Sequence, residues 1–292
     1  MGELPKDKLL TIRKILTEAQ KGKDTKERIE IFVKEFSDQY DNLGPDAIAW
    51  MRHSVLVAEE VFGLEIDHFL DSSPQGAWDS TTPVLTAAML HYIKPEHTVI
   101  SLGPGPFATE ACVVSKEKDM QIITLEIWEP YIESGKKTSE ANNANVIFIK
   151  SDVYTPIDPV QTRCLPKADN ASVQDKNKLP ENVDYITWNP PYVPSADAKK
   201  SGFFDSPKVV SYAFDGGPEG TTLIERGLRE LPENWKTNAK LLFGVNTVKV
   251  SEDSMRRIAE KNGFNLLEIF KLSGSPCEVF VFQHTSAITG DK

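Results

Sequence analysis

From residue 97 to residue 283, short apolar runs alternate with segments in which apolar residues return every three or four positions. The apolar runs are too continuous to leave one face for water, which is typical of a parallel sheet covered by helices on both sides. Only SGSP separates the last two runs, so they predict an antiparallel hairpin at the sheet edge. We therefore expect an α/β fold with a mostly parallel seven-stranded sheet. Its strands are expected at 97–102, 120–126, 145–150, 183–188, 239–245, 265–272 and 277–283, and the helices between them at 108–117, 130–142, 220–231 and 251–263.

The first sixty residues have a helical pattern instead, with apolar positions every three or four residues. Gly, Asp and Pro collect between the periodic segments, and a stretch rich in turn formers follows at 71–83. We expect a small helical N-terminal domain at 1–75 and an α/β domain at 76–292. The polar stretch 155–182 is expected to be a surface insertion. The N-terminal helices are expected at 9–16, 28–36 and 47–62.

The charge of the chain argues against nucleic acid as a partner. It has 33 Lys and Arg against 43 Asp and Glu, a net charge of −10. Such a surface repels phosphate backbones unless a local basic patch overrides it. Nucleic acid is therefore a disfavoured partner.

The cysteines and histidines predict neither a disulfide framework nor a metal site. Cys112, Cys164 and Cys277 lie far apart, and the five histidines form no pair at metal-binding spacing. This use of cysteine is typical of a reducing compartment. No signal core and no stretch of membrane-spanning length is seen. We expect a cytoplasmic protein without a membrane partner, and the sequence leaves its oligomeric state open.

Three of the expected strands end in residues that suit a nucleoside. Gly103 and Gly105 follow the first strand and would let the backbone approach a ligand, although the third glycine of the dinucleotide pattern is replaced by Ala108. Glu126 ends the second strand, where an open α/β sheet places a carboxylate for ribose hydroxyls. Asp152 follows the third strand and is suited to accept from an amino group. The structural alternatives are that the two glycines only form a tight connection, that Glu126 is a solvated surface residue and that Asp152 only forms a turn.

The fourth strand runs into the sequence WNPPYVP, residues 188–194. Pro190 and Pro191 have fixed φ and no N–H, so this segment is stiff and rich in acceptors. The Asn189 side-chain oxygen and the neighbouring carbonyls suit a planar NH2 group, whose lone pair is delocalised and whose nitrogen must be held against an electrophile. The ring of Tyr192 would stack against one face of the planar group. The alternative is that the segment is only a rigid loop that closes the strand.

The order LGPGP, LEIWEP, SDVYTP, WNPPYVPS, FDGGPEGTTLIERGL resembles the HemK-type class I S-adenosylmethionine-dependent methyltransferases, which methylate a glutamine side chain of translation release factors. The resemblance extends from about Trp78 to the C-terminus, and it implies a Rossmann-like class I methyltransferase fold for the domain 76–292. The helical module 1–75 resembles the one that bacterial members use to recognise their substrate, which implies a substrate-recognition domain. It also implies that Gly103 and Gly105 line the methionine part of the cofactor. Glu126 would hold the ribose, and Asp152 with Val153 would face the adenine. Asn189 and Pro190 would bind the acceptor nitrogen, beside Tyr192, and Asn189 would also lie in contact with the cofactor.

We therefore expect an enzyme that transfers a methyl group from S-adenosylmethionine, leaving S-adenosylhomocysteine, to a planar amide or amino nitrogen. The run WDSTTP stands where release-factor enzymes have an arginine-proline-glutamate-threonine run, so the acceptor stays open between a protein glutamine and a small-molecule amine, amide or amino acid. A non-catalytic S-adenosylmethionine-binding protein and a nicotinamide dehydrogenase remain alternatives. The run 195–211 is expected to be either a lid over the substrate or a surface loop.

Overall fold

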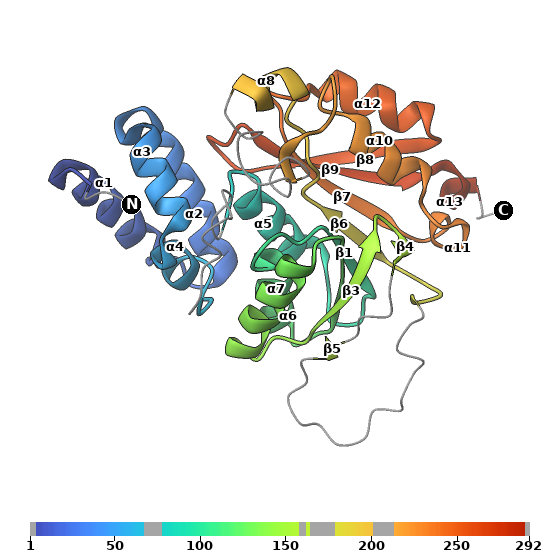
Figure 1. Cartoon of the computed structure of the whole chain (residues 1–292), viewed down its shortest axis with the longest axis horizontal. Coiled ribbons are helices and arrows are strands. Elements are labelled where there is room, and N and C mark those ends of the chain that lie inside the picture. The colour runs from blue at the N-terminus through green and yellow to red at the C-terminus, as the bar shows by residue number, and fades with distance from the viewer. Residues whose placement is uncertain (1–3, 67–77, 158–161, 164–178, 201–212, 290–292) are drawn as a thin grey trace.

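The computed structural model describes residues 4–66, 78–157, 162–163, 179–200 and 213–289 (Figure 1). Its centre is a nine-stranded sheet with the order β4-β3-β2-β1-β6-β7-β9-β8, and β5 pairs with β3 beside this path. The strands are β1 (Val99–Leu102), β2 (Ile122–Glu126), β3 (Val146–Asp152), β4 (Thr155–Pro156), β5 (Thr162–Arg163), β6 (Tyr185–Trp188), β7 (Lys240–Asn246), β8 (Phe264–Lys271) and β9 (Cys277–His284).

The strand directions confirm the predicted mostly parallel sheet. β1 pairs in parallel with β2 and β6, β2 with β3, and β6 with β7. The last two strands form the predicted antiparallel hairpin, in which β9 lies between β7 and the edge strand β8. Seven long strands correspond to the seven predicted ones. The two additional strands, β4 and β5, have two residues each and lie in the stretch predicted as an insertion.

Helices cover both faces of the sheet (Figure 1). One buried cluster joins the N-terminal helices, α5 and α6 to one face, and a second joins α10, α11 and α12 to the other. Apolar residues on both faces explain why the strands read as continuous apolar runs. The helices are α1 (Lys6–Ala19), α2 (Thr25–Asp38), α3 (Tyr40–His53), α4 (Val55–Glu60), α5 (Thr82–Tyr92), α6 (Thr109–Lys118), α7 (Glu129–Ala141), α8 (Ser195–Lys200), α10 (Thr222–Arg229), α11 (Glu233–Lys236), α12 (Glu252–Lys261) and α13 (Thr285–Thr289).

The N-terminal region has four helices where three were predicted. The expected third helix is divided at Ser54, whose side chain accepts a hydrogen bond from the Leu56 N–H at 3.2 Å and so caps α4. α3 begins earlier than expected and contains a kink at Gly44, where φ is 72°. The predicted boundary between residues 75 and 76 lies outside the described residues, and the division into two domains stays a prediction.

α5 has no counterpart among the predicted helices. It packs against β6, β7 and β9, and its residues from Thr82 to Leu90 are all buried. A helix that is buried on every side lacks the polar stripe on which a periodic pattern depends. The segment that leads into it is hydrogen-bonded to the residues that follow β6, beside the candidate site.

Candidate active site

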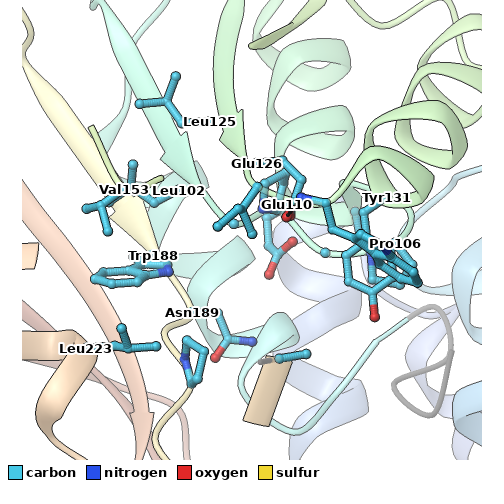
Figure 2. A pocket seen from close by; sticks show the side chains of 18 of the residues that line it. Leu102, Pro106, Glu110, Leu125, Glu126, Tyr131, Val153, Trp188, Asn189 and Leu223 are labelled. Carbon is cyan, nitrogen blue, oxygen red and sulfur yellow. Dashed lines mark hydrogen bonds between the residues drawn. The ribbon is translucent and has the colours of Figure 1, made fainter. Parts of the chain in front are cut away.

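A cavity of about 650 Å³ opens at the carboxyl ends of β1, β2, β3 and β6 (Figure 2). β1 lies between β2 and β6, so the chain proceeds in opposite directions across the sheet from this strand. In an open α/β sheet, such a reversal leaves a crevice in which ligands bind. The predicted site residues therefore converge because the strands that carry them are parallel neighbours.

The glycine turn lies at the first of these strand ends. Gly103 and Gly105 line the cavity, with φ of 50° and 73°, and the Gly103 N–H donates to the Leu125 carbonyl at 2.7 Å. These positive φ values favour glycine over residues with a Cβ. The turn is thereby held against β2 while its backbone faces the cavity.

Glu126 ends β2 with its carboxyl group buried beside the cavity. One oxygen, Oε1, accepts from the Trp128 N–H at 2.9 Å. Burial raises the pKa of Glu126 to about 7, and hydrogen bonds from the backbone N–H groups of Trp128, Ile127 and Gly105 oppose the rise. A carboxylate in this position can accept from two neighbouring hydroxyl groups of a ligand.

Asp152 and Val153 lie at the end of β3, and both line the cavity. Arg226 donates from Nη1 to Asp152 Oδ1 at 2.7 Å and from Nε to Glu230 at 2.9 Å, so one Asp152 oxygen is occupied by an arginine from α10. Val153 has φ of 52°. A left-handed backbone is strained for a β-branched residue, and strain of this kind is concentrated at functional sites.

Asn189 follows β6 and lines the same cavity. Its side-chain Nδ2 donates to Asp79 Oδ2 at 2.9 Å. Its Oδ1 is buried and has no hydrogen-bond partner within the described part of the chain. Burying a carbonyl oxygen without a hydrogen bond costs roughly 1–3 kcal/mol of desolvation free energy, and a donor from a ligand can offset this cost.

Pro190 and Tyr192 are placed differently from the other predicted residues. The cavity lining among the described residues includes Pro191, and neither Pro190 nor Tyr192 is part of it. The Tyr192 hydroxyl lies 2.7 Å from Thr81 Oγ1, and burial raises its pKa well above the usual value. Tyr192 therefore keeps its proton and anchors the segment, while its predicted stacking role stays a prediction.

The turn before α10 holds the segment that follows Asn189. The Val193 N–H donates to the Phe214 carbonyl at 3.0 Å, and the Gly216 N–H donates to the Val193 carbonyl at 2.9 Å. Gly220 has φ of 76°, and a Cβ atom there would overlap the Tyr192 carbonyl oxygen. The two segments that carry the resemblance most specifically, NPPYVPS and DGGPEG, are thus packed against each other.

Several residues of the cavity lining were not predicted from the sequence, and four of them carry polar or aromatic side chains that the site uses: Asp79, Glu110, Trp128 and Arg226. Glu110 is buried in α6, and burial raises its pKa to about 8. Figure 2 shows Glu110 between Glu126 and Asn189. An acidic residue in a helix's first turn is typical of exposed helix starts, so its spacing carries no signal of burial.

Within the described residues, no group of three or more His, Cys, Asp or Glu side chains could hold a metal ion. None of the described helices is long and apolar enough to cross a membrane. Cys112 and Cys277 are both buried, and Cys164 lies outside the described residues.

No protein-family model matches the chain. The chain is 23% identical over 198 residues to the release factor glutamine methyltransferase of Bacillus cereus, covering 68% of this chain and 63% of that protein. It is 22% identical over 162 residues to the enzyme of the same name from Bacillus anthracis, covering 56% of this chain and 50% of that protein. It thus spans less than two thirds of these curated relatives.

Among solved structures, a methyltransferase from Pyrococcus furiosus superposes with a TM-score of 0.52 at 17% identity, covering 81% of this chain and 96% of that one. At this low sequence identity the superposition shows a shared fold, and it confirms the predicted Rossmann-like architecture.

Proposed function

From the premise that this chain is a homologue of the release factor glutamine methyltransferases, we propose that it transfers a methyl group from S-adenosylmethionine to a planar amide or amino nitrogen. The observation that carries the proposal is the Asn189 amide. Its nitrogen is engaged by Asp79, and its oxygen is a buried acceptor without a partner among the described residues. An acceptor of this kind suits the N–H of an incoming amide.

The residues around the cavity fit S-adenosylmethionine. A volume of about 650 Å³ is within the range of small-molecule sites. Glu126 would accept from the ribose hydroxyls, and the second oxygen of Asp152 would accept from the adenine amino group. Ile127, an exposed apolar side chain at the cavity wall, would contact the base. When bound, the cofactor supplies an electrophilic methyl group on a sulfonium.

The protein's part in this transfer is positional and electrostatic. Asn189 Oδ1, which lines the cavity, would accept one N–H of the acceptor group. The Pro190 carbonyl would accept the other, although Pro190 is not in the lining, so the acceptor would have to reach past Pro191. Together the two oxygens would aim the nitrogen lone pair. They would also stabilise the positive charge that grows on that nitrogen, and each preorganised contact would contribute on the order of a few kcal/mol. The stiffness of the two prolines keeps both acceptors in place before the ligand arrives. No covalent intermediate on the protein is needed.

We favour a protein glutamine as the acceptor because the curated relatives are named for that substrate. A net charge of −10, with the carboxyl groups of Asp79 and Glu126 in the cavity lining, disfavours an acceptor that carries phosphates. The three cysteines lie far apart in the sequence, which is typical of a reducing compartment and supports a location of the enzyme in the cytoplasm. A small-molecule amide or amine is the second candidate, since the WDSTTP run differs from the release-factor pattern.

A label-transfer experiment tests the proposal. The full chain is incubated with S-adenosylmethionine labelled in its methyl group and with cell extract, and the products are separated into polypeptide and low-mass fractions. Label in a polypeptide, located by mass spectrometry on a glutamine side chain, is the expected result. Asn189→Ala should abolish the label while binding S-adenosylhomocysteine as tightly as the wild type in calorimetry, because Asn189 acts on the acceptor.

Each other outcome of this experiment decides an alternative. Label only in the low-mass fraction would replace the glutamine with a small-molecule acceptor. Tight cofactor binding without any transfer would identify a non-catalytic binding protein. Equal transfer by the Asn189→Ala variant would refute the assigned role of the amide.

A further inference from the structure

Asp79 determines which way the Asn189 amide faces. It lies in the segment that leads into α5, where no site residue was predicted from the sequence. Asp79 Oδ2 accepts from Asn189 Nδ2 at 2.9 Å. A carboxylate offers no hydrogen, so it can bind only the NH2 end of the amide. Rotation of the amide by half a turn would put two oxygens against each other.

The carboxylate itself is fixed by the start of α5. Asp79 Oδ1 accepts from the Thr81 N–H at 2.8 Å, from the Thr82 N–H at 2.9 Å and from the Thr82 hydroxyl at 3.1 Å. Three donors on one oxygen leave the other oxygen with a single direction, toward Asn189. The orientation of the amide is therefore determined by the backbone of a buried helix.

The same short segment also holds the far end of the double-proline segment. Thr81 Oγ1 lies 2.7 Å from the Tyr192 hydroxyl and donates to Cys277 Sγ at 3.5 Å. Residues 79–82 thus contact the side chains on both sides of Pro190 and Pro191. This second contact is independent of the first and argues that the segment has one common task.

We propose that Asp79 is a positioning residue, which keeps Asn189 Oδ1 available as the acceptor for the substrate NH2. The inference rests on the proposed function of Asn189. A hydrogen bond to a charged group contributes about 1.5–3 kcal/mol, which favours one amide orientation over the other by roughly 10-fold to 150-fold. Without Asp79, the amide would present its NH2 to the substrate NH2 for much of the time.

A pair of amide–carboxylate exchanges tests this inference. In Asp79→Asn, the new side-chain oxygen keeps the contacts with Thr81 and Thr82, and the new NH2 faces Asn189. The Asn189 amide must then turn over and loses its acceptor. We expect kcat for methyl transfer to fall about 100-fold, the effect typical of one lost transition-state contact, with S-adenosylhomocysteine affinity unchanged.

The double variant Asp79→Asn with Asn189→Asp restores the pattern. The NH2 group introduced at position 79 would donate to one oxygen of the carboxylate introduced at position 189, and the other oxygen of that carboxylate would again be an acceptor. We expect the double variant to exceed either single variant in kcat by at least about 10-fold. Asp253→Asn, an exposed change of the same chemistry in α12, serves as the control and should leave transfer unchanged.

A second readout does not depend on activity. The side-chain 15N amide signal of Asn189, identified by its loss in Asn189→Asp, should lie downfield and exchange slowly in the wild type. Both properties should be lost in Asp79→Asn. An Asn189 signal that is identical in the two proteins, or a double variant no more active than the singles, would overturn the inference. A wild type without any methyl transfer would refute the proposed function, and the amide signal would still decide the role of Asp79.

Discussion

The two buried carboxyl groups of the cavity, Glu126 and Glu110, differ in the number of donors around them. Glu126 is reached by the N–H groups of three neighbouring residues, whereas the hydrogen bond that lowers the pKa of Glu110 comes from its own backbone. Burial nevertheless dominates in both, and raises their pKa values to about 7 and about 8. Glu126 is therefore the better prepared of the two to be a carboxylate toward a ligand at neutral pH.

Replacing Glu126 with Gln should weaken cofactor binding. The change puts an NH2 group where two ribose hydroxyls need acceptors, so the affinity for S-adenosylhomocysteine should fall about 10-fold to 150-fold, as for one lost hydrogen bond to a charged group. Calorimetry at pH 8 measures the effect. The affinity for an analogue without the ribose hydroxyls should be the same in both proteins, and an equal loss for that analogue would remove Glu126 from the ribose site.

Some of these residues were predictable and others were not, for a physical reason. Gly103, Glu126 and Asn189 stand at the ends of apolar strands, so the sheet geometry places them together without any further information. Asp79 and Glu110 belong to helix starts, where an acidic residue is common and carries no indication of what it faces. Only the packing of α5 and α6 against the sheet brings their carboxyl groups to the cavity.

At the scale of elements, the burial and length of a helix or strand affected whether its sequence pattern predicted it. α2 and α12 have one buried and one exposed face, and the predicted ranges match them closely. α5 is buried on all sides along its first nine residues, Thr82 to Leu90, so its apolar residues have no helical period. The two-residue strands β4 and β5 are too short for an alternating pattern. The half-exposed helices were therefore predicted, as were the buried strands β1 and β6 and the buried helix α6 between strands, whereas α5 and the two-residue strands were not.

The packing of one turn against another yields a prediction at Gly220. Alanine there would adopt a left-handed φ and overlap the Tyr192 carbonyl oxygen, so the double-proline segment must shift. We expect the variant to lose about 1 kcal/mol or more of unfolding free energy and most of the proposed methyl transfer. Urea unfolding and label transfer measure the two effects.

Gly44 provides the matched control for this change. It has a similar φ of 72°, and a Cβ atom there would meet nothing within 4 Å among the described residues. Gly44→Ala should therefore lose stability from the backbone alone and keep its methyl transfer. If both alanine variants transfer equally well, the contact between Gly220 and Tyr192 has no part in the site.

At the scale of the whole molecule, the N-terminal helices share a buried cluster with one face of the sheet. Trp78 contacts these helices. It packs against Phe32 and Phe36 with ring centroids 5.3 Å and 5.5 Å apart, and its Nε1 donates to the Met51 carbonyl at 3.3 Å. Because Trp78 also lines the cavity, the packing of the helices and the shape of the site depend on one side chain.

Trp78→Ala should lower the free energy of unfolding by about 3–5 kcal/mol, as for a buried aromatic residue. Trp235 is the matched comparison, because it is equally buried in the other cluster and donates its Nε1 to the Pro180 carbonyl at 2.9 Å. If the chain unfolds as one unit, both variants shift a single denaturant transition. A separate early transition in Trp78→Ala alone would show that the predicted domain 1–75 unfolds independently.

The buried carboxyl groups also make the stability of the whole chain depend on pH. The pKa of Glu110 is about 8 in the folded state against an ordinary value of 4.5, so the folded chain binds more protons between these values and its unfolding free energy falls as pH rises through this window.

Glu110→Gln removes this contribution. The variant should match the wild type near pH 4.5 and exceed its unfolding free energy at pH 8 by at least about 1 kcal/mol, since one pKa unit corresponds to about 1.4 kcal/mol. Urea unfolding at both pH values measures the difference, with Glu59→Gln, an exposed change in α4, as the control that should show none. A Glu110→Gln variant that is less stable than the wild type by the same amount at both pH values would mean that burial does not oppose the charged form of this carboxyl group.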